Sequence, residues 1–156
     1  MSSMVEDAEY FRLAMVAGLL PPQEVISWAD STVARLDEPP LALIDLSLGS
    51  VSDPHQMSRR LGILATGDAG RDVAARRVFR LLHDQLFTGE LSHRQVVSAL
   101  DILGREANGL SESEAEFLSW VGDEFELVDS GYKEMGAAER ELEHFLGGYA
   151  ATTLDA

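Results

Sequence analysis

The stretch "RLDEPPLALIDLSLGS", residues 35–50, decides whether the chain is all-helical or mixed. A strand requires alternating apolar residues, and Leu41 and Leu43 begin such an alternation before Ile44 breaks it. A helix instead places Leu41, Ile44 and Leu48 on one face, at spacings of three and seven residues. The preceding proline pair presets a first helical turn, and the glycine after Leu48 suits a helix end. We therefore expect a short, mostly buried helix here.

Helix start signals recur along the rest of the chain, and no other segment has a convincing strand pattern. Prolines at 21–22 and the Asp-Pro pair at 53–54 each open a helix. Ser92 caps the segment that follows it, and Ser111 with Glu114 makes a capping box. The sequence predicts an all-α fold, a bundle of about seven to eight helices.

Residues 71–89 carry the clearest helical pattern. The apolar stripe of this segment consists of Ala75, Val78, Phe79, Leu82 and Leu86. Arg76, Arg77 and Arg80 cluster on the opposite side. We expect the apolar stripe to be buried and the arginines to face outward or toward another acidic element.

The composition indicates one domain over residues 1–156, with a frayed tail over 146–156. A chain of 156 residues with 46% apolar content is long enough to bury a core. The absence of cysteine excludes disulfides and thiolate chemistry. The longest apolar run, residues 13–20, is too short to cross a bilayer, and the acidic start is unlike a secretory signal. We expect a cytoplasmic protein that does not bind membranes.

The net charge of −15 is the strongest compositional signal. It argues against nucleic-acid binding, because phosphates require lysine and arginine to neutralise them. It favours a basic protein partner, because complementary fields speed encounter and select partners. The alternative is that the acidity serves solubility alone. Residues 106–156 hold 13 acids and 2 bases, so the charge is concentrated in the C-terminal third.

The first candidate binding surface lies on the expected helix after Ser111. Residues 106–132 contain eight acids and neither lysine nor arginine. The expected buried side of the helix consists of Phe117, Val121, Phe125 and Val128. The expected outward side consists of Glu112, Glu116, Asp123 and Glu126, with Trp120 beside it as an aromatic anchor. Two alternatives remain open: plain solvation, and neutralisation by Arg76, Arg77 and Arg80.

The second candidate surface surrounds the two proline pairs. Its members are Trp28, Asp30, Asp37, Glu38 and Asp45. An isolated carboxylate on an apolar helix lies at the solvent edge or is held by an arginine, because an unpaired buried charge is unfavourable. Arg35, Arg59 and Arg60 are the candidate partners of Asp45.

Motifs for catalysis are almost absent. The sequence has no phosphate-binding loop, no dinucleotide fingerprint and no Gly-x-Ser-x-Gly motif. Glu-x-x-His occurs twice, at 90–93 and 141–144, and paired motifs of this kind build di-metal sites in helical bundles. The first pair precedes a helix instead of lying within one, so a di-metal enzyme is the least favoured reading. We expect no enzyme activity, no cofactor and no metal.

Residues 10–48 resemble small bacterial all-α proteins of uncharacterised function. The shared features are an aromatic-rich first helix, the Trp-Ala-Asp segment at 28–30, and an acidic Pro-Pro followed by a leucine-rich helix. Some proteins of this kind resemble immunity proteins that neutralise bacterial toxins. The resemblance implies a toxin inhibitor without catalytic residues. A helical adaptor that binds its partner through a hydrophobic groove is the alternative, and the partner's identity and the oligomeric state stay open.

Overall fold

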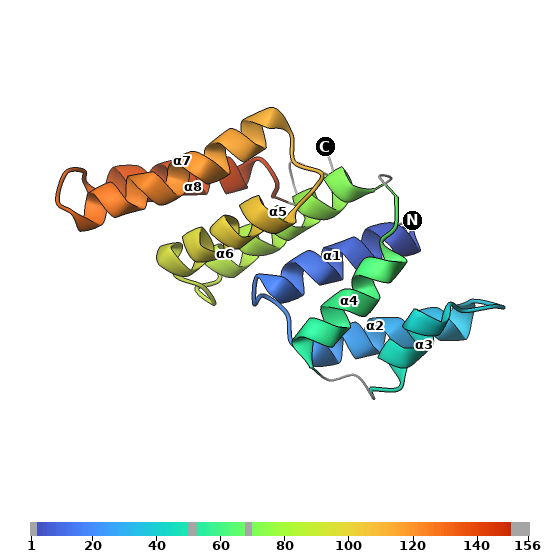
Figure 1. Cartoon of the computed structure of the whole chain (residues 1–156). Coiled ribbons are helices and arrows are strands. Elements are labelled where there is room, and N and C mark those ends of the chain that lie inside the picture. The colour runs from blue at the N-terminus through green and yellow to red at the C-terminus, as the bar shows by residue number, and fades with distance from the viewer. Residues whose placement is uncertain (1–2, 50–52, 68–69, 151–156) are drawn as a thin grey trace. The chain divides into compact units, whose positions relative to one another are not determined.

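The computed structural model describes residues 3–49, 53–67 and 70–150. Within these ranges every regular element is an α-helix, and eight helices follow one another along the chain (Figure 1). They are α1 (Met4–Val16), α2 (Pro22–Arg35), α3 (Leu41–Ser47), α4 (Pro54–Leu64), α5 (Arg71–Phe87), α6 (His93–Glu106), α7 (Glu112–Asp129) and α8 (Met135–Gly147). The prediction of an all-α bundle of seven to eight helices is confirmed.

The helices fall into two compact units, Met1–Ala74 and Ala75–Ala156, and the boundary lies near the start of α5. Each unit has its own buried apolar residues and is described by itself. The expectation of a single folding domain concerns the cooperativity of unfolding, and it stays a prediction.

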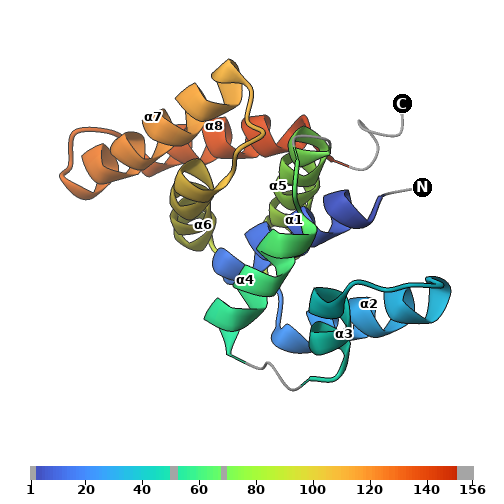
Figure 2. The ribbon, with the colours of Figure 1, turned by 45° about the vertical axis from the view of Figure 1, so that its right-hand side comes forward.

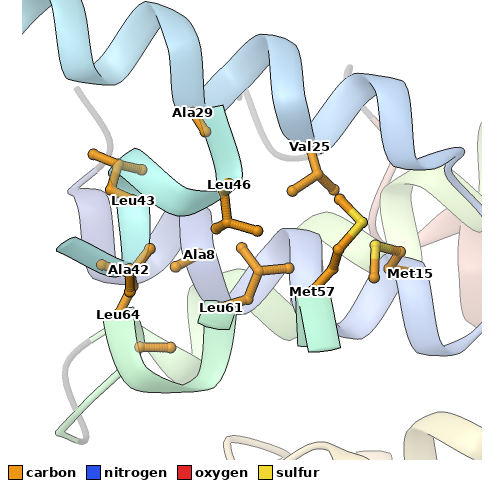
Figure 3. Packing of buried hydrophobic residues seen from close by; sticks show 11 residues of the cluster. Ala8, Met15, Val25, Ala29, Ala42, Leu43, Leu46, Met57, Leu61 and Leu64 are labelled. Atoms are coloured by element: carbon orange, nitrogen blue, oxygen red, sulfur yellow. The ribbon is translucent and has the colours of Figure 1, made fainter. Parts of the chain in front are cut away.

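The first unit is built around α1, α2, α3 and α4. α1 packs on α4, and α3 packs on both α2 and α4. Figure 3 shows the apolar side chains that these helices direct toward one another. The buried cluster consists of Ala8, Met15, Val25, Ala29, Ala42, Leu43, Leu46, Met57, Leu61, Leu64 and Ala65.

The helix at α3 exists as expected, but its buried face is not the expected one. Leu43 and Leu46 are 0% exposed, whereas Leu41 is 74% and Leu48 is 71% exposed. The prediction that Leu41, Ile44 and Leu48 form the buried face is therefore wrong. A seven-residue helix with three leucines and an isoleucine has apolar side chains on more than one face, and contact with α2 and α4 selects which are covered.

The second unit contains α6, α7, α8 and most of α5. The predicted α5 stripe is buried, and Val78, Phe79 and Leu82 are 0% exposed. α7 packs on α6 on one side and on α8 on the other, and Figures 1 and 2 show α7 and α8 running side by side. Both predicted serine caps are present. The Ser92 hydroxyl accepts the backbone N–H of Gln95, and the Ser111 hydroxyl accepts the backbone N–H of Glu114.

The end of α8 contributes side chains to the buried part of the second unit. Leu146 is 0% exposed, and the Tyr149 ring lies 5.0 Å from the ring of Phe79 and 5.3 Å from that of Phe145. The expected tail thus begins inside α8, which ends at Gly147, and whether residues 146–150 fray stays a prediction. Residues 151–156 of the expected tail lie outside the described residues.

Candidate partner-binding site

The outward face of α7 is acidic, as the helical spacing predicts. Glu112, Glu116, Asp123 and Glu126 are all exposed. On the opposite side Val121 and Phe125 are buried, while Phe117 and Val128 are half-buried instead of fully covered. Leu118, which was not among the residues expected on this side, is 6% exposed and completes it.

The four outward carboxylates have no hydrogen bond and no ion pair within the described ranges. Their pairing with Arg76, Arg77 or Arg80, one of the two alternatives raised by the sequence, is therefore absent from residues 70–150. Like charges three or four residues apart repel by a few tenths of a kcal/mol per pair. The face keeps this repulsion unrelieved, which suits an external cation.

The other acidic side chains of α7 form hydrogen bonds or ion pairs within the second unit. Glu124 is 8% exposed and holds Lys133, and Glu114 is 9% exposed and holds the Tyr149 hydroxyl. Asp129 is bound by the Arg94 guanidinium, with an Nη2–Oδ1 distance of 2.5 Å, and this hydrogen bond raises the pKa of Arg94. Sequence reasoning missed the burial of both glutamates, although the capping-box position of Glu114 was a usable signal.

Trp120 lies on the flank of the acidic face with a rigid support behind it. Its indole is 39% exposed, and its ring centre lies 5.6 Å from that of Phe117. Phe117 in turn stacks on Phe145 with a centroid distance of 4.0 Å and an interplanar angle of 13°. Leu127, seven residues after Trp120, is 37% exposed on the same flank. An aromatic ring fixed in this way loses little side-chain entropy on binding.

Two hollows lie on either side of the acidic face of α7. The first, between α6 and α7, has a volume of about 630 Å³. Its lining residues are Arg94, Val97, Ser98, Asp101, Ile102, Arg105, Gly122, Phe125, Glu126 and Asp129. The ion pairs of Arg94 with Asp129 and of Arg105 with Asp101 lie along it, so its apolar floor has charged ends.

The second hollow, between α7 and α8, has a volume of about 410 Å³. It is lined by Trp120, Glu124, Lys133, Glu134, Ala137, Ala138 and Glu141. Trp120 therefore borders both the acidic face and this hollow. Sequence spacing on a single helix gives no sign of either hollow, because each is formed between two helices.

The second candidate surface, in the first unit, is only partly available. Asp30, Asp37 and Glu38 are exposed. Trp28 is half-buried: its indole N–H donates to Asp7 Oδ2 at 3.4 Å, and its ring lies 5.1 Å from the ring of Phe11. Trp28 is partly buried against the apolar cluster of the first unit and is therefore only partly accessible to a partner.

Asp45 lies at the solvent edge and is also paired with an arginine, so both alternatives that the sequence left open apply to it. Its carboxylate is about one-third exposed, and Oδ2 lies 3.4 Å from Nε of Arg60. Of the three candidate arginines, Arg60 is thus the one that this ion pair uses. Leu41 of the same helix and Leu48, its C-cap residue, are exposed, so this surface also has an apolar part.

Within the described ranges, the two Glu-x-x-His motifs do not come together as a cluster of three or more metal ligands. His93 Nε2 lies 2.8 Å from Oε1 of Glu143 on α8, while Glu90 is exposed in the turn before α6. Among the residues described, no three His, Asp or Glu side chains are placed to share a metal ion. In the same ranges, no helix combines the length and the apolar character needed to cross a membrane.

Comparison with known proteins adds nothing to this picture. No protein-family model, no curated protein and no solved structure matches the chain. The class of protein is therefore given by the fold alone, an all-α protein, and its function is inferred from the surfaces described above.

Proposed function

We propose that this protein binds a basic protein partner and occludes it. The binding surface is the outward face of α7, formed by Glu112, Glu116, Trp120, Asp123 and Glu126, and is called the acidic surface below. The observation that carries the proposal is a set of four exposed carboxylates beside a supported tryptophan, and within residues 3–49, 53–67 and 70–150 none of the four has a hydrogen bond or an ion pair.

The carboxylates and the apolar side chains of this region have different roles in the proposed binding. The unpaired carboxylates attract a basic partner over a distance of about 10 Å at ordinary ionic strength and raise the association rate. Trp120 and Leu127 supply apolar area at the edge of the acidic surface, which slows dissociation. The interaction relieves the repulsion between neighbours such as Glu112 and Glu116, which is an additional favourable contribution.

The partner class that we propose is a bacterial toxin with a basic active surface. The support is the resemblance of residues 10–48 to small bacterial all-α proteins, some of which resemble immunity proteins. Occlusion requires no chemistry from this chain, in keeping with a sequence in which catalytic motifs are almost absent. A cytoplasmic location and the absence of nucleic-acid binding belong to the same proposal, since the net charge of −15 repels phosphates.

The test compares two charge-reversed variants with identical net charge. Glu116→Lys with Asp123→Lys reverses the acidic surface, while Glu24→Lys with Glu90→Lys reverses two exposed acids elsewhere. A nona-arginine peptide is titrated into each by calorimetry at two salt concentrations. We expect the first variant to lose at least about tenfold in affinity relative to the second, equivalent to roughly 1.4 kcal/mol. Equal losses would assign the attraction to net charge alone.

A second candidate function, a helical adaptor with an apolar groove, is favoured by the hollow between α6 and α7. Its floor combines Phe125 and Ile102 with Gly122, beside which a Cβ atom meets no other atom within 4 Å. Gly122→Leu adds an apolar side chain at this hollow, where the Cβ position is unobstructed. Partner binding that is lost in Gly122→Leu, but survives both high salt and reversal of Glu116 and Asp123, assigns function to the groove instead of the acidic surface.

A further inference from the structure

The hollow between α7 and α8 already holds a cation supplied by the chain itself. Lys133, the one lysine of the sequence, places Nζ 2.6 Å and 2.7 Å from the two carboxylate oxygens of Glu124. The Glu124 side chain is 10% exposed, whereas that of Lys133 is 47% exposed. One wall of the hollow is thus a neutralised ion pair, and the geometry demonstrates that a basic side chain reaches this wall.

The remaining walls carry negative charge that is not neutralised. Glu134 and Glu141 are exposed, and neither has a hydrogen bond or an ion pair in the described part of the chain. The Trp120 indole forms a third wall, and the small side chains of Ala137 and Ala138 leave the hollow open. An indole and two exposed carboxylates that line the same hollow suit a side chain that is both planar and cationic.

We propose that this hollow receives an arginine side chain of the partner. A guanidinium group stacks on an indole face and donates several N–H groups in its plane, so it engages Trp120 and the carboxylates of Glu134 and Glu141 together. A lysine ammonium is a compact, strongly hydrated charge and does not stack in this way. This inference rests on the proposed function, since it names the residue type by which a basic partner is selected.

The role of Lys133 follows from the same geometry. By neutralising Glu124, it leaves the hollow with the two charges of Glu134 and Glu141 for one incoming cation. It also occupies the most buried carboxylate, so the incoming group binds at the outer part of the hollow beside Trp120. The acidic surface then steers the partner, and the hollow selects arginine.

The test uses small probes with the full chain, labelled with ¹⁵N, and follows the indole N–H signal of Trp120. N-acetyl-arginine amide is titrated in parallel with the lysine analogue and with the citrulline analogue, which has the shape of arginine without its charge. We expect a saturable shift of the Trp120 signal with the arginine probe and an apparent affinity at least fivefold weaker with the other two. The Trp28 signal, whose N–H is engaged with Asp7, is the internal reference.

Two variants decide whether the hollow is responsible. Glu134→Gln with Glu141→Gln keeps side-chain size and removes both free charges, and we expect at least a tenfold loss of affinity for the arginine probe. Glu24→Gln with Glu90→Gln, outside the hollow, is the matched control and keeps the affinity within twofold. Trp120→Leu keeps an apolar side chain and removes the ring, and we expect it to abolish the preference for arginine over lysine, read from backbone amides of Ala137 and Ala138.

Three outcomes would overturn the assignment: equal shifts with the arginine and citrulline probes, no saturable shift, or unchanged affinity in the Glu134 and Glu141 variant. These outcomes are separable from failure of the proposed function. If reversal of Glu116 and Asp123 still weakens nona-arginine selectively, the acidic surface stands and the arginine hollow alone is rejected. If that selectivity is absent as well, both are rejected.

Discussion

Tyr149 donates a 2.5 Å hydrogen bond from its hydroxyl to Oε2 of Glu114, 35 residues earlier in the chain. The other oxygen of the same carboxylate accepts the backbone N–H of Ser111 at 2.8 Å. One glutamate therefore closes the capping box of α7 and fixes the chain after α8. This contact holds the α7 start, which carries Glu112, against the end of the second unit.

Removal of this hydroxyl is predicted to destabilise the protein. Tyr149→Phe leaves one oxygen of a carboxylate that is 9% exposed without its donor. We expect the free energy of unfolding to fall by about 1–3 kcal/mol, the range for bonds to charged groups. Urea denaturation measures this loss, and Tyr132→Phe, at a position 80% exposed, is the control that should change nothing measurable.

The same contact predicts how stability depends on alkaline pH. Burial of the Tyr149 phenol, its hydrogen bond to Glu114 and the negative charge of that carboxylate raise the pKa of Tyr149 well above its usual value. The unfolded chain therefore loses this proton at a lower pH than the folded chain does. Stability linked to Tyr149 is full below about pH 10 and declines as the pH rises above it. Tyr149→Phe should show a shallower alkaline decline, and an identical slope would contradict this linkage.

Two glycines of the second unit are predicted to respond to alanine in opposite directions. Gly122 lies within α7 and Gly131 lies after it with a φ of 82°, and an added Cβ meets nothing within 4 Å at either position. Gly122→Ala should stabilise the protein by about 1 kcal/mol through helix propensity. Gly131→Ala should destabilise it by about 1–2 kcal/mol, because the left-handed conformation is unfavourable with a Cβ. Thermal unfolding of both variants measures the difference.

The leucines of α3 are predicted to divide into two classes. Leu43→Ala and Leu46→Ala each remove a side chain that is 0% exposed and should cost about 2–5 kcal/mol of stability. Leu41→Ser and Leu48→Ser change side chains that are more than two-thirds exposed and should stay within about 0.5 kcal/mol of the parent. A loss near 2 kcal/mol in either serine variant would contradict the observed face of α3.

Glu9 and Arg12 of α1 are predicted to be strongly coupled. Two bonds join them, Nε–Oε2 at 2.9 Å and Nη2–Oε1 at 2.6 Å, and their side chains are 4% and 13% exposed. Glu9→Ala leaves the guanidinium nearly buried without this carboxylate and should lower stability by about 3–5 kcal/mol. Glu9→Leu with Arg12→Leu should recover part of this loss. Additive effects in the double-variant cycle would argue against the coupling.

Local signals in the sequence predicted most of the helices. A side chain that caps a helix acts within three residues, so Ser92 and Ser111 marked the starts of α6 and α7 without knowledge of the packing. The apolar stripe of α5 was equally readable, because its opposite face carries arginines. The outward carboxylates of α7 followed from the same helical spacing.

The sequence did not predict the features that depend on contact between two helices. The phase of α3 was wrong because Leu41 and Leu43 are equally apolar, and contact with α2 and α4 decides which is covered. The burial of Glu124 depends on Lys133, which reaches back from the turn after α7. Both hollows beside α7 are spaces between helices, so single-helix periodicity contains no information about them.

The separation of Trp28 and Trp120 into different units gives each unit its own intrinsic fluorophore. Trp28→Phe and Trp120→Phe each leave one emitter, so the emission of either variant follows the unfolding of a single unit. Coincident denaturation midpoints would establish that the 156 residues unfold as one cooperative domain. Separated midpoints would assign each unit its own stability. The unit whose midpoint rises when a partner is added would then be the unit that binds it.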